Sequence, residues 1–222
     1  MFKLFSNGCS FLTTRPKDGV DTFTSKIIAD HYGMALHNLA MGGRGNDRLC
    51  FTTKHWFETN TKKDVFAVIG FSSTHRMDYV TNDGWKKGKV PGTDLTWRTW
   101  KVGEQLKFVD SQQGWDIEQT GTMRWLNHVL DLQNYFENHE IPYVMYNSLP
   151  VEIVKNKGDF DALKAGINTK RYFKIDDSHY NYVMETKQIV SPQDPHPSTS
   201  GHEQWAKQLI EFIDANNLRT QR

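Results

Sequence analysis

The sequence has little cysteine, little net charge and no long apolar run, and each shortage excludes a class of protein. Its two cysteines, Cys9 and Cys50, are too few for a disulfide framework and form no CxxC metal or redox motif. The 27 basic residues nearly cancel the 26 acidic ones. The chain therefore lacks the strong positive field of a nucleic-acid or anionic-membrane binder, and we expect neither partner.

The apolar segments also bear on where the protein acts. None approaches the length of a membrane span. Residues 1–11 run directly into strand-like sequence, without the basic and apolar regions of a signal peptide. We expect a cytoplasmic protein, with release by cell lysis or association with a virus particle as alternatives.

Short apolar runs alternate with segments of helical spacing along most of the chain. Strands are expected at 2–5, 34–40, 64–71 and 141–146, and helices at 23–28, 49–57, 125–136 and 205–213. Asp21 is expected to cap the first helix and Gly33 to end it. The run 64–71 is nearly continuous in apolar residues, which is typical of a central parallel strand covered on both faces.

This alternation predicts a parallel sheet with helices on both faces. The length of 222 residues fits one α/β domain covering residues 1–222. The pattern fails at about 81–121, a polar, glycine-containing stretch that holds Trp85, Trp97, Trp100 and Trp115, and it is ambiguous at 151–190. We interpret the stretch at about 81–121 as a long insertion into the domain.

The loops after the strands carry the candidate chemistry, because ligands bind beyond the carboxyl ends of parallel strands. A serine attacks an ester when a base takes its proton, an acceptor orients the base and donors stabilise the oxyanion. Ser10 follows the first strand, and a glycine at 43 or 45 would let a backbone N–H approach a substrate. His196 precedes the last helix, with Asp194 close enough in sequence to orient it.

Three sequence blocks carry a resemblance to a known family. Residues 8–11, Gly-Cys-Ser-Phe, resemble the GDSL block of SGNH hydrolases, in the GCSF form associated with phage and environmental bacterial proteins. Residues 38–43 resemble the second block, in which Gly43 matches the glycine that donates a backbone N–H. Residues 194–198, Asp-Pro-His-Pro-Ser, resemble the last block, which supplies the Asp and His of the triad. The ordered set resembles that of an SGNH (GDSL-like) hydrolase along the whole chain.

Two positions depart from the family pattern. Where the third block has Gly-x-Asn-Asp, this chain has Gly-Phe-Ser-Ser at 70–73, so Ser72 replaces the oxyanion-binding Asn. Loss of such a donor costs about 3 kcal/mol of transition-state stabilisation. The usual Asp-x-x-His is shortened to Asp-x-His, which leaves Gln193 at the expected carboxylate position.

The resemblance implies a three-layer α/β/α sandwich with a flavodoxin-like parallel sheet and the activity of a serine esterase or deacylase. Ser10 would attack, His196 would transfer the proton and Asp194 would orient His196. The N–H groups of Ser10 and Gly43, with the Ser72 hydroxyl, would hold the oxyanion. No cofactor and no metal are implied.

The insertion and one polar loop suggest which ester would bind. Arg76, Trp85, Trp97 and Trp100 are candidate contacts for a small ester, in particular an O-acyl carbohydrate, because tryptophans stack on sugar rings. The same tryptophans could instead pin the insertion to the domain, and Arg76 could be solvated surface.

Other interpretations remain open at this stage. Cys9 is an alternative nucleophile. The loop 42–47 could cradle a phosphate in a nucleotide-binding doubly wound domain. Asp194, His196 and His202 could ligate a metal, although no second cluster completes the set. Finally, the chain could be a ligand-binding module that keeps the fold and has lost efficient turnover.

Overall fold

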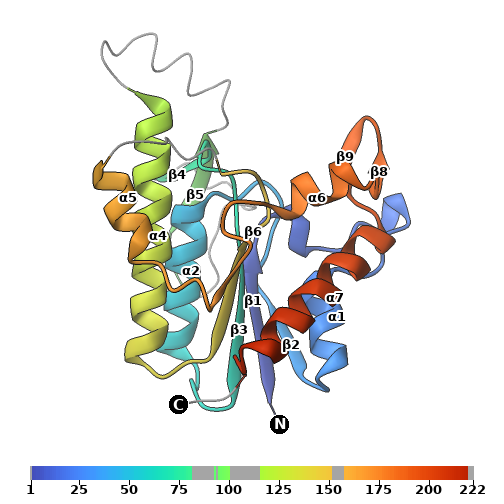
Figure 1. Ribbon diagram of the computed structural model, residues 1–222, viewed down its shortest axis with the longest axis horizontal. Coiled ribbons are helices and arrows are strands. Elements are labelled where there is room, and N and C mark those ends of the chain that lie inside the picture. Colours follow the sequence, from blue (N-terminus) through green and yellow to red (C-terminus); the bar gives the residue numbers. More distant parts are fainter. Residues whose placement is uncertain (1, 82–92, 94, 101–115, 152–157, 220–222) are drawn as a thin grey trace.

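A five-stranded parallel sheet forms the centre of the computed structural model, which describes residues 2–81, 93, 95–100, 116–151 and 158–219 (Figure 1). Its strands are β1 (Lys3–Gly8), β2 (Ala35–Asn38), β3 (Val65–Phe71), β6 (Tyr143–Asn147) and β7 (Tyr172–Phe173). They lie in the order β2-β1-β3-β6-β7, and every neighbouring pair is parallel. Among themselves this is the flavodoxin-like order 2-1-3-4-5, so the predicted fold class is confirmed.

Helices cover both faces of the sheet and make the three layers visible in Figure 1. On one side lie α1 (Thr24–His31) and α7 (Thr199–Ala215), and on the other lie α2 (Asn46–Thr59), α4 (Ile117–Asn138) and α5 (Gly158–Ala165). The short helix α6 (His179–Glu185) and the 3₁₀ turns η1 (Ser10–Leu12) and η2 (Pro16–Asp18) occupy the loops. None of the described helices combines the length and apolar character needed to cross a bilayer.

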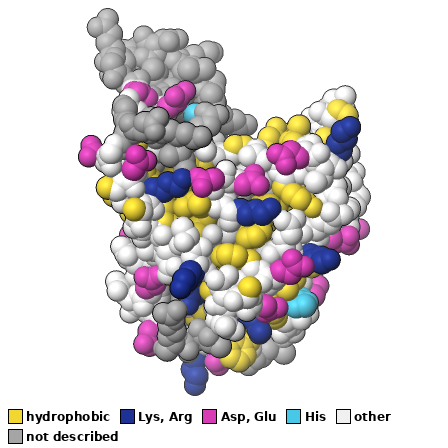
Figure 2. Space-filling model, viewed as in Figure 1, with side chains coloured by type: hydrophobic (Ala, Val, Ile, Leu, Met, Phe, Trp, Pro, Cys, Tyr) yellow, Lys and Arg dark blue, Asp and Glu magenta, His cyan; other side chains and the backbone are white. Residues whose placement is uncertain are grey.

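Charged side chains of both signs are interspersed over the described part of the face shown in Figure 2. This mixture agrees with the balanced composition of 27 basic and 26 acidic residues.

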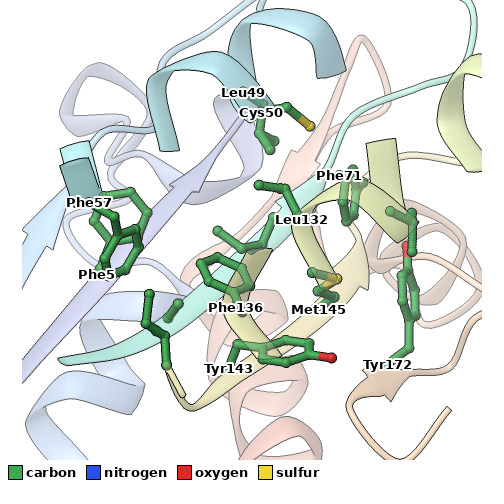
Figure 3. Close-up of a cluster of buried hydrophobic side chains, with 14 of the residues drawn as sticks. Phe5, Leu49, Cys50, Phe57, Phe71, Leu132, Phe136, Tyr143, Met145 and Tyr172 are labelled. Atoms are coloured by element: carbon green, nitrogen blue, oxygen red, sulfur yellow. The ribbon is translucent and has the colours of Figure 1, made fainter. Parts of the chain in front are cut away.

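The two faces of the sheet pack into separate cores because successive strand residues point to opposite sides. In β1, Phe5 joins a cluster with α2 and α4, whereas its neighbour Leu4 joins the cluster beneath α1 and α7. Figure 3 shows the first cluster, in which Phe57 and Phe136 lie beside the sheet. All seven residues of β3 are buried, which explains the nearly continuous apolar run at 64–71.

Two antiparallel hairpins extend from the three layers. One pairs β4 (Met77–Thr81) with β5 (Thr96–Trp100), and the other pairs β8 (Ile189–Ser191) with β9 (Asp194–Pro197). The expected insertion at about 81–121 therefore contains a strand and the start of α4. This helix begins before its apolar pattern does because the Asp116 side chain caps it, accepting a hydrogen bond from the N–H of Gln119.

The ends of α1 test two further expectations, and the start of α7 shows a capping serine. Helix α1 begins at Thr24 with Phe23 as N-cap and no side-chain cap, so the prediction that Asp21 caps it is wrong. Gly33 follows this helix with a φ of +63°, in the left-handed region where glycine is favoured. Ser198 caps α7, its Oγ accepting a hydrogen bond from the N–H of Gly201 at 3.2 Å.

Gly70, in β3, should not tolerate a side chain. A Cβ at this position would lie 2.4 Å from Ser148 Oγ and 2.6 Å from Leu12 Cδ1. We expect Gly70→Ala to destabilise the protein by about 1–3 kcal/mol and to lower Tm by roughly 3–10 °C, measured by thermal unfolding. Gly158→Ala is the matched control, since among the described residues no atom beyond its chain neighbours and its own helix lies within 4 Å of its added Cβ. Equal Tm values for the two variants would contradict the prediction.

Candidate active site

The site lies where β1 and β3 end side by side. Gly8, the last residue of β1, is the Cα partner of Gly70 in β3. Beyond Gly8 the chain turns at Cys9 and opens η1 with Ser10, whose side chain is partly buried. A Cβ on Gly42 would lie 3.7 Å from the Cβ of Ser10, so the loop after β2 reaches this turn.

His196 connects this turn to the β8–β9 hairpin. Its Nε2 lies 2.8 Å from Ser10 Oγ, and its Nδ1 lies 2.5 Å from Asp194 Oδ1. A carboxylate only accepts hydrogen bonds, so in the neutral imidazole Nδ1 carries the proton and Nε2 is the acceptor that faces the Ser10 hydroxyl. The three side chains form the chain of contacts that nucleophilic catalysis requires.

The shortened Asp-x-His spacing has a simple structural basis in β9. Asp194 and His196 lie two residues apart on this strand, so their side chains leave on the same face. Pro195 between them restricts Asp194 to extended backbone, and Asp194 Oδ1 also accepts a hydrogen bond from the His196 N–H at 3.2 Å. Gln193 is exposed.

The surroundings of Asp194 keep it ionised. Burial opposes the charge, but the hydrogen bonds from His196 and the nearby Arg15 guanidinium outweigh it, so the pKa of the Asp194 carboxyl lies below its usual value. The carboxylate is then available to stabilise a protonated His196.

The candidate oxyanion donors lie on the neighbouring loops. Gly43 has a φ of +79°, a conformation that favours glycine. Ser72 is buried at the end of β3, where its backbone N–H donates to Asn46 Oδ1 at 2.7 Å and its C=O accepts from Asn46 Nδ2 at 3.0 Å. Arg76 Nη1 donates to Ser72 Oγ at 3.1 Å, which leaves the O–H of Ser72 as a donor.

The sequence did not indicate how the loop 42–47 is held. Asp78, in β4, accepts hydrogen bonds from the N–H groups of Gly45 at 3.1 Å and Arg48 at 2.9 Å. A Cβ on Gly45 would lie 2.8 Å from Asp78 Oδ2, so this glycine permits the close approach. Burial raises the pKa of the Asp78 carboxyl. No local pattern links an aspartate in a polar stretch to a distant loop, so sequence reasoning had no signal for it.

The candidate substrate-binding residues differ in their surroundings. Arg76 lies beside Ser72 and also donates to the Arg44 carbonyl oxygen at 3.3 Å. Trp100 contacts Tyr79, with ring centroids 5.0 Å apart. Trp97 is only 8% exposed and packs on Phe51, with centroids 5.5 Å apart. Trp85 lies outside the described residues.

The burial of Trp97 favours the packing interpretation for this residue. We expect Trp97→Ala to lower the free energy of unfolding by about 3 kcal/mol, as large-to-small core substitutions do, and to change KM less than twofold. Thermal unfolding and steady-state kinetics on the same preparation would measure both effects. A large rise in KM at unchanged Tm would instead place Trp97 against the substrate.

The other open interpretations can also be located. Cys9 is fully buried in the core beneath α1 and α7, whereas His196 contacts Ser10. His202 is buried in the first turn of α7, with its Nδ1 3.2 Å from Thr24 Oγ1. Across the described ranges, no group of three or more His, Cys, Asp and Glu side chains could hold a metal ion.

Comparison with known proteins rests on structure, since no family model and no curated protein matches the chain. A protein assigned to the lipolytic G-D-S-L family, from Desulfitobacterium hafniense DCB-2, matches with a TM-score of 0.51, covering 96% of this chain and 99% of that one at 10% identity. The chain shares its fold with this G-D-S-L protein.

Two esterases also match the fold of this chain. A catalytic mutant of Axe2, an acetylxylan esterase from Geobacillus stearothermophilus, matches at a TM-score of 0.51 and 15% identity, covering 96% of this chain and 94% of that one. The psychrotrophic esterase EstA from Pseudoalteromonas sp. matches at 0.50 and 8% identity, covering 96% and 97%. At these identities the likeness establishes the fold, and the chemistry must be argued from the side chains.

Proposed function

We propose that this chain is a serine esterase of the SGNH superfamily that hydrolyses a small ester through an acyl-enzyme. The observation that carries the proposal is the position of the His196 imidazole, with Nε2 2.8 Å from Ser10 Oγ and Nδ1 2.5 Å from Asp194. The fold shared with an acetylxylan esterase and with EstA supports an esterase in general.

The reaction follows from this arrangement in two halves. Ser10 Oγ attacks the ester carbonyl while its proton passes to His196 Nε2, and Asp194 stabilises the imidazolium. The N–H groups of Ser10 and Gly43 and the hydroxyl of Ser72 hold the negative oxygen of the tetrahedral intermediate. The alcohol leaves with the proton from His196, and a water activated by the same imidazole then releases the acid from Ser10.

The proposed substrate is a short acyl group on a polar acceptor such as a carbohydrate. The loop after β3 offers polar side chains, since Arg76 Nη1 donates to Ser72 Oγ at 3.1 Å. The acetylxylan esterase fold supports the same substrate class. We propose that residues 1–222 act as one domain without a cofactor, in the cytoplasm, and that the GCSF block places the chain in the phage and environmental bacterial branch.

The replacement of the family's Asn by Ser72 favours one second candidate, a ligand-binding module with weak turnover. A fluorophosphonate probe separates the two, because it labels only an activated serine. We expect labelling of the wild type and none of Ser10→Ala, together with hydrolysis of p-nitrophenyl acetate or acetylated xylo-oligosaccharides. A wild-type protein that neither labels nor turns over any ester of that panel would contradict the enzyme and leave the binding module.

A further inference from the structure

The carboxylate of Asp194 has a second partner, besides His196, that the sequence did not single out. Oδ1 receives both hydrogen bonds from His196, and Oδ2 forms an ion pair with Arg15 Nη2. Each oxygen of the Asp194 carboxylate therefore contacts a different residue. Both side chains are about one-quarter exposed, at 24% for Arg15 and 26% for Asp194, so solvent screens the attraction and the pair adds little to stability.

Arg15 is itself held firmly at the start of η2. Its N–H donates to the Val20 carbonyl at 2.7 Å, and its own carbonyl accepts from the N–H groups of Val20 at 3.1 Å and Asp18 at 2.9 Å. Its Nε donates to Asp18 Oδ2 at 2.9 Å, which fixes the plane of the guanidinium. Arg15 is therefore a preorganised donor rather than a free surface side chain.

The contact between Arg15 and Asp194 Oδ2 matters because Asp194 and His196 lie so close together in β9. With the acid only two residues before the base, Oδ1 is occupied by the backbone and the ring of the same His196. Rotation of the carboxyl group would move this oxygen away from Nδ1. Arg15 contacts the other oxygen and opposes that rotation. It comes from a different segment of the chain, which begins with Ser10.

We propose that Arg15 is a positioning residue that fixes the Asp194 carboxylate against His196 and offsets part of its negative charge. The inference rests on the proposed function. It also ties the segment that follows the nucleophile to the hairpin that carries the acid and the base. Figure 1 places the turn after β1 and the β8–β9 hairpin at the same end of the sheet.

The charged and titratable groups around His196 set the sign of the electrostatic effect. Asp194 favours the imidazolium, and Arg15, paired with Asp18, opposes it. His202 and His179 are buried in the core, and burial lowers the pKa of His202 to about 3 and that of His179 well below its usual value, so both stay neutral. Removing the Arg15 charge should therefore raise the pKa of His196.

The test compares Arg15→Gln, Arg15→Lys and the control Lys17→Gln, which removes an exposed positive charge from the same turn. The first readout is kcat and KM for p-nitrophenyl acetate between about pH 5 and pH 9. The second is the pKa of the His196 ring by NMR, assigned with His196→Asn, which needs no turnover. Thermal unfolding of each variant confirms that it is folded.

We expect Arg15→Gln to lower kcat about tenfold with little change in KM, and to raise the pKa of His196 by about half a unit. The acid limb of kcat/KM then moves to higher pH, because the neutral imidazole is the active form. Arg15→Lys should restore the pKa but only part of kcat, since an ammonium lacks the planar fork. Lys17→Gln should match the wild type in both readouts.

Two results would overturn the inference. One is an Arg15→Gln protein that equals Lys17→Gln in kcat and in the pKa of His196. The other is equal loss of kcat in Arg15→Gln and Arg15→Lys with an unmoved pKa, which indicates a merely structural role. Neither result affects the proposed function, which fails only if the wild type shows no Ser10-dependent hydrolysis. If the wild type shows none, the NMR titration still tests the placement of Arg15.

Discussion

Ser10→Ala should abolish ester hydrolysis, with kcat falling by about 10⁴-fold or more. Removing Oγ deletes the atom that would form the acyl-enzyme and leaves His196 Nε2 without the hydroxyl 2.8 Å away. The side chain is small and only partly buried, so no sizeable core cavity forms. We expect Tm to stay within about 2 °C of the wild type. Steady-state kinetics on p-nitrophenyl acetate and thermal unfolding measure the two quantities.

Cys9→Ala is the matched control for this variant. Cys9 precedes Ser10 directly, but it is fully buried in the core beneath α1 and α7. Its thiol therefore faces the interior, and we expect Cys9→Ala to keep kcat within a fewfold of the wild type. Near wild-type hydrolysis by Ser10→Ala would end the hypothesis, and loss of activity in Cys9→Ala alone would reassign the nucleophile.

Asp194→Asn should lower kcat by roughly 10³- to 10⁴-fold with little change in KM. The neutral amide cannot stabilise the imidazolium formed during attack, and its NH₂ group can hold His196 in the wrong tautomer. Because the pKa of the Asp194 carboxyl is lowered, its favourable charge is fully present above the usual aspartate pKa and is lost only as the pH falls through the lowered value. The defect should therefore persist across the neutral range, which a pH profile of kcat would measure.

Gln193→Ala tests the alternative carboxylate position suggested by the family spacing. Gln193 is exposed, and Asp194 rather than Gln193 contacts His196. We expect its kcat within about twofold of the wild type, as for surface substitutions away from the chemistry. An Asp194→Asn enzyme within tenfold of the wild type, or an equal loss in Gln193→Ala, would mean that His196 is oriented by another group.

Much of the fold could be predicted from local patterns. The apolar run of β3 and the helical spacing of α7 each reflect burial along one element, which the sequence records directly. The start of α4 was not predicted, because its first turns are polar and depend on the cap at Asp116. The cap of α1 was wrongly assigned to Asp21, because a favourable residue type does not fix the residue at which a helix begins.

The candidate site likewise contains residues that the sequence could predict and residues that it could not. Ser10, Asp194 and His196 stand in short ordered blocks, so the sequence could suggest them together. Arg15 and Asp78 contact residues far away in the chain, and their roles follow from side-chain pairs between segments that share no periodicity. Such contacts leave no mark in a single sequence, and only the folded chain brings them together.

The β8–β9 hairpin has a consequence for how this site could lose or regain activity. Because Asp194 and His196 share β9, a shift of the hairpin as a rigid body would carry the acid and the base together. Their mutual contact would survive such a shift, whereas the distance from Nε2 to Ser10 would change. An intact aspartate–histidine pair is therefore no sign of competence in this protein. The proposed activity would require, in addition to that pair, the docking of this short hairpin onto the turn after β1.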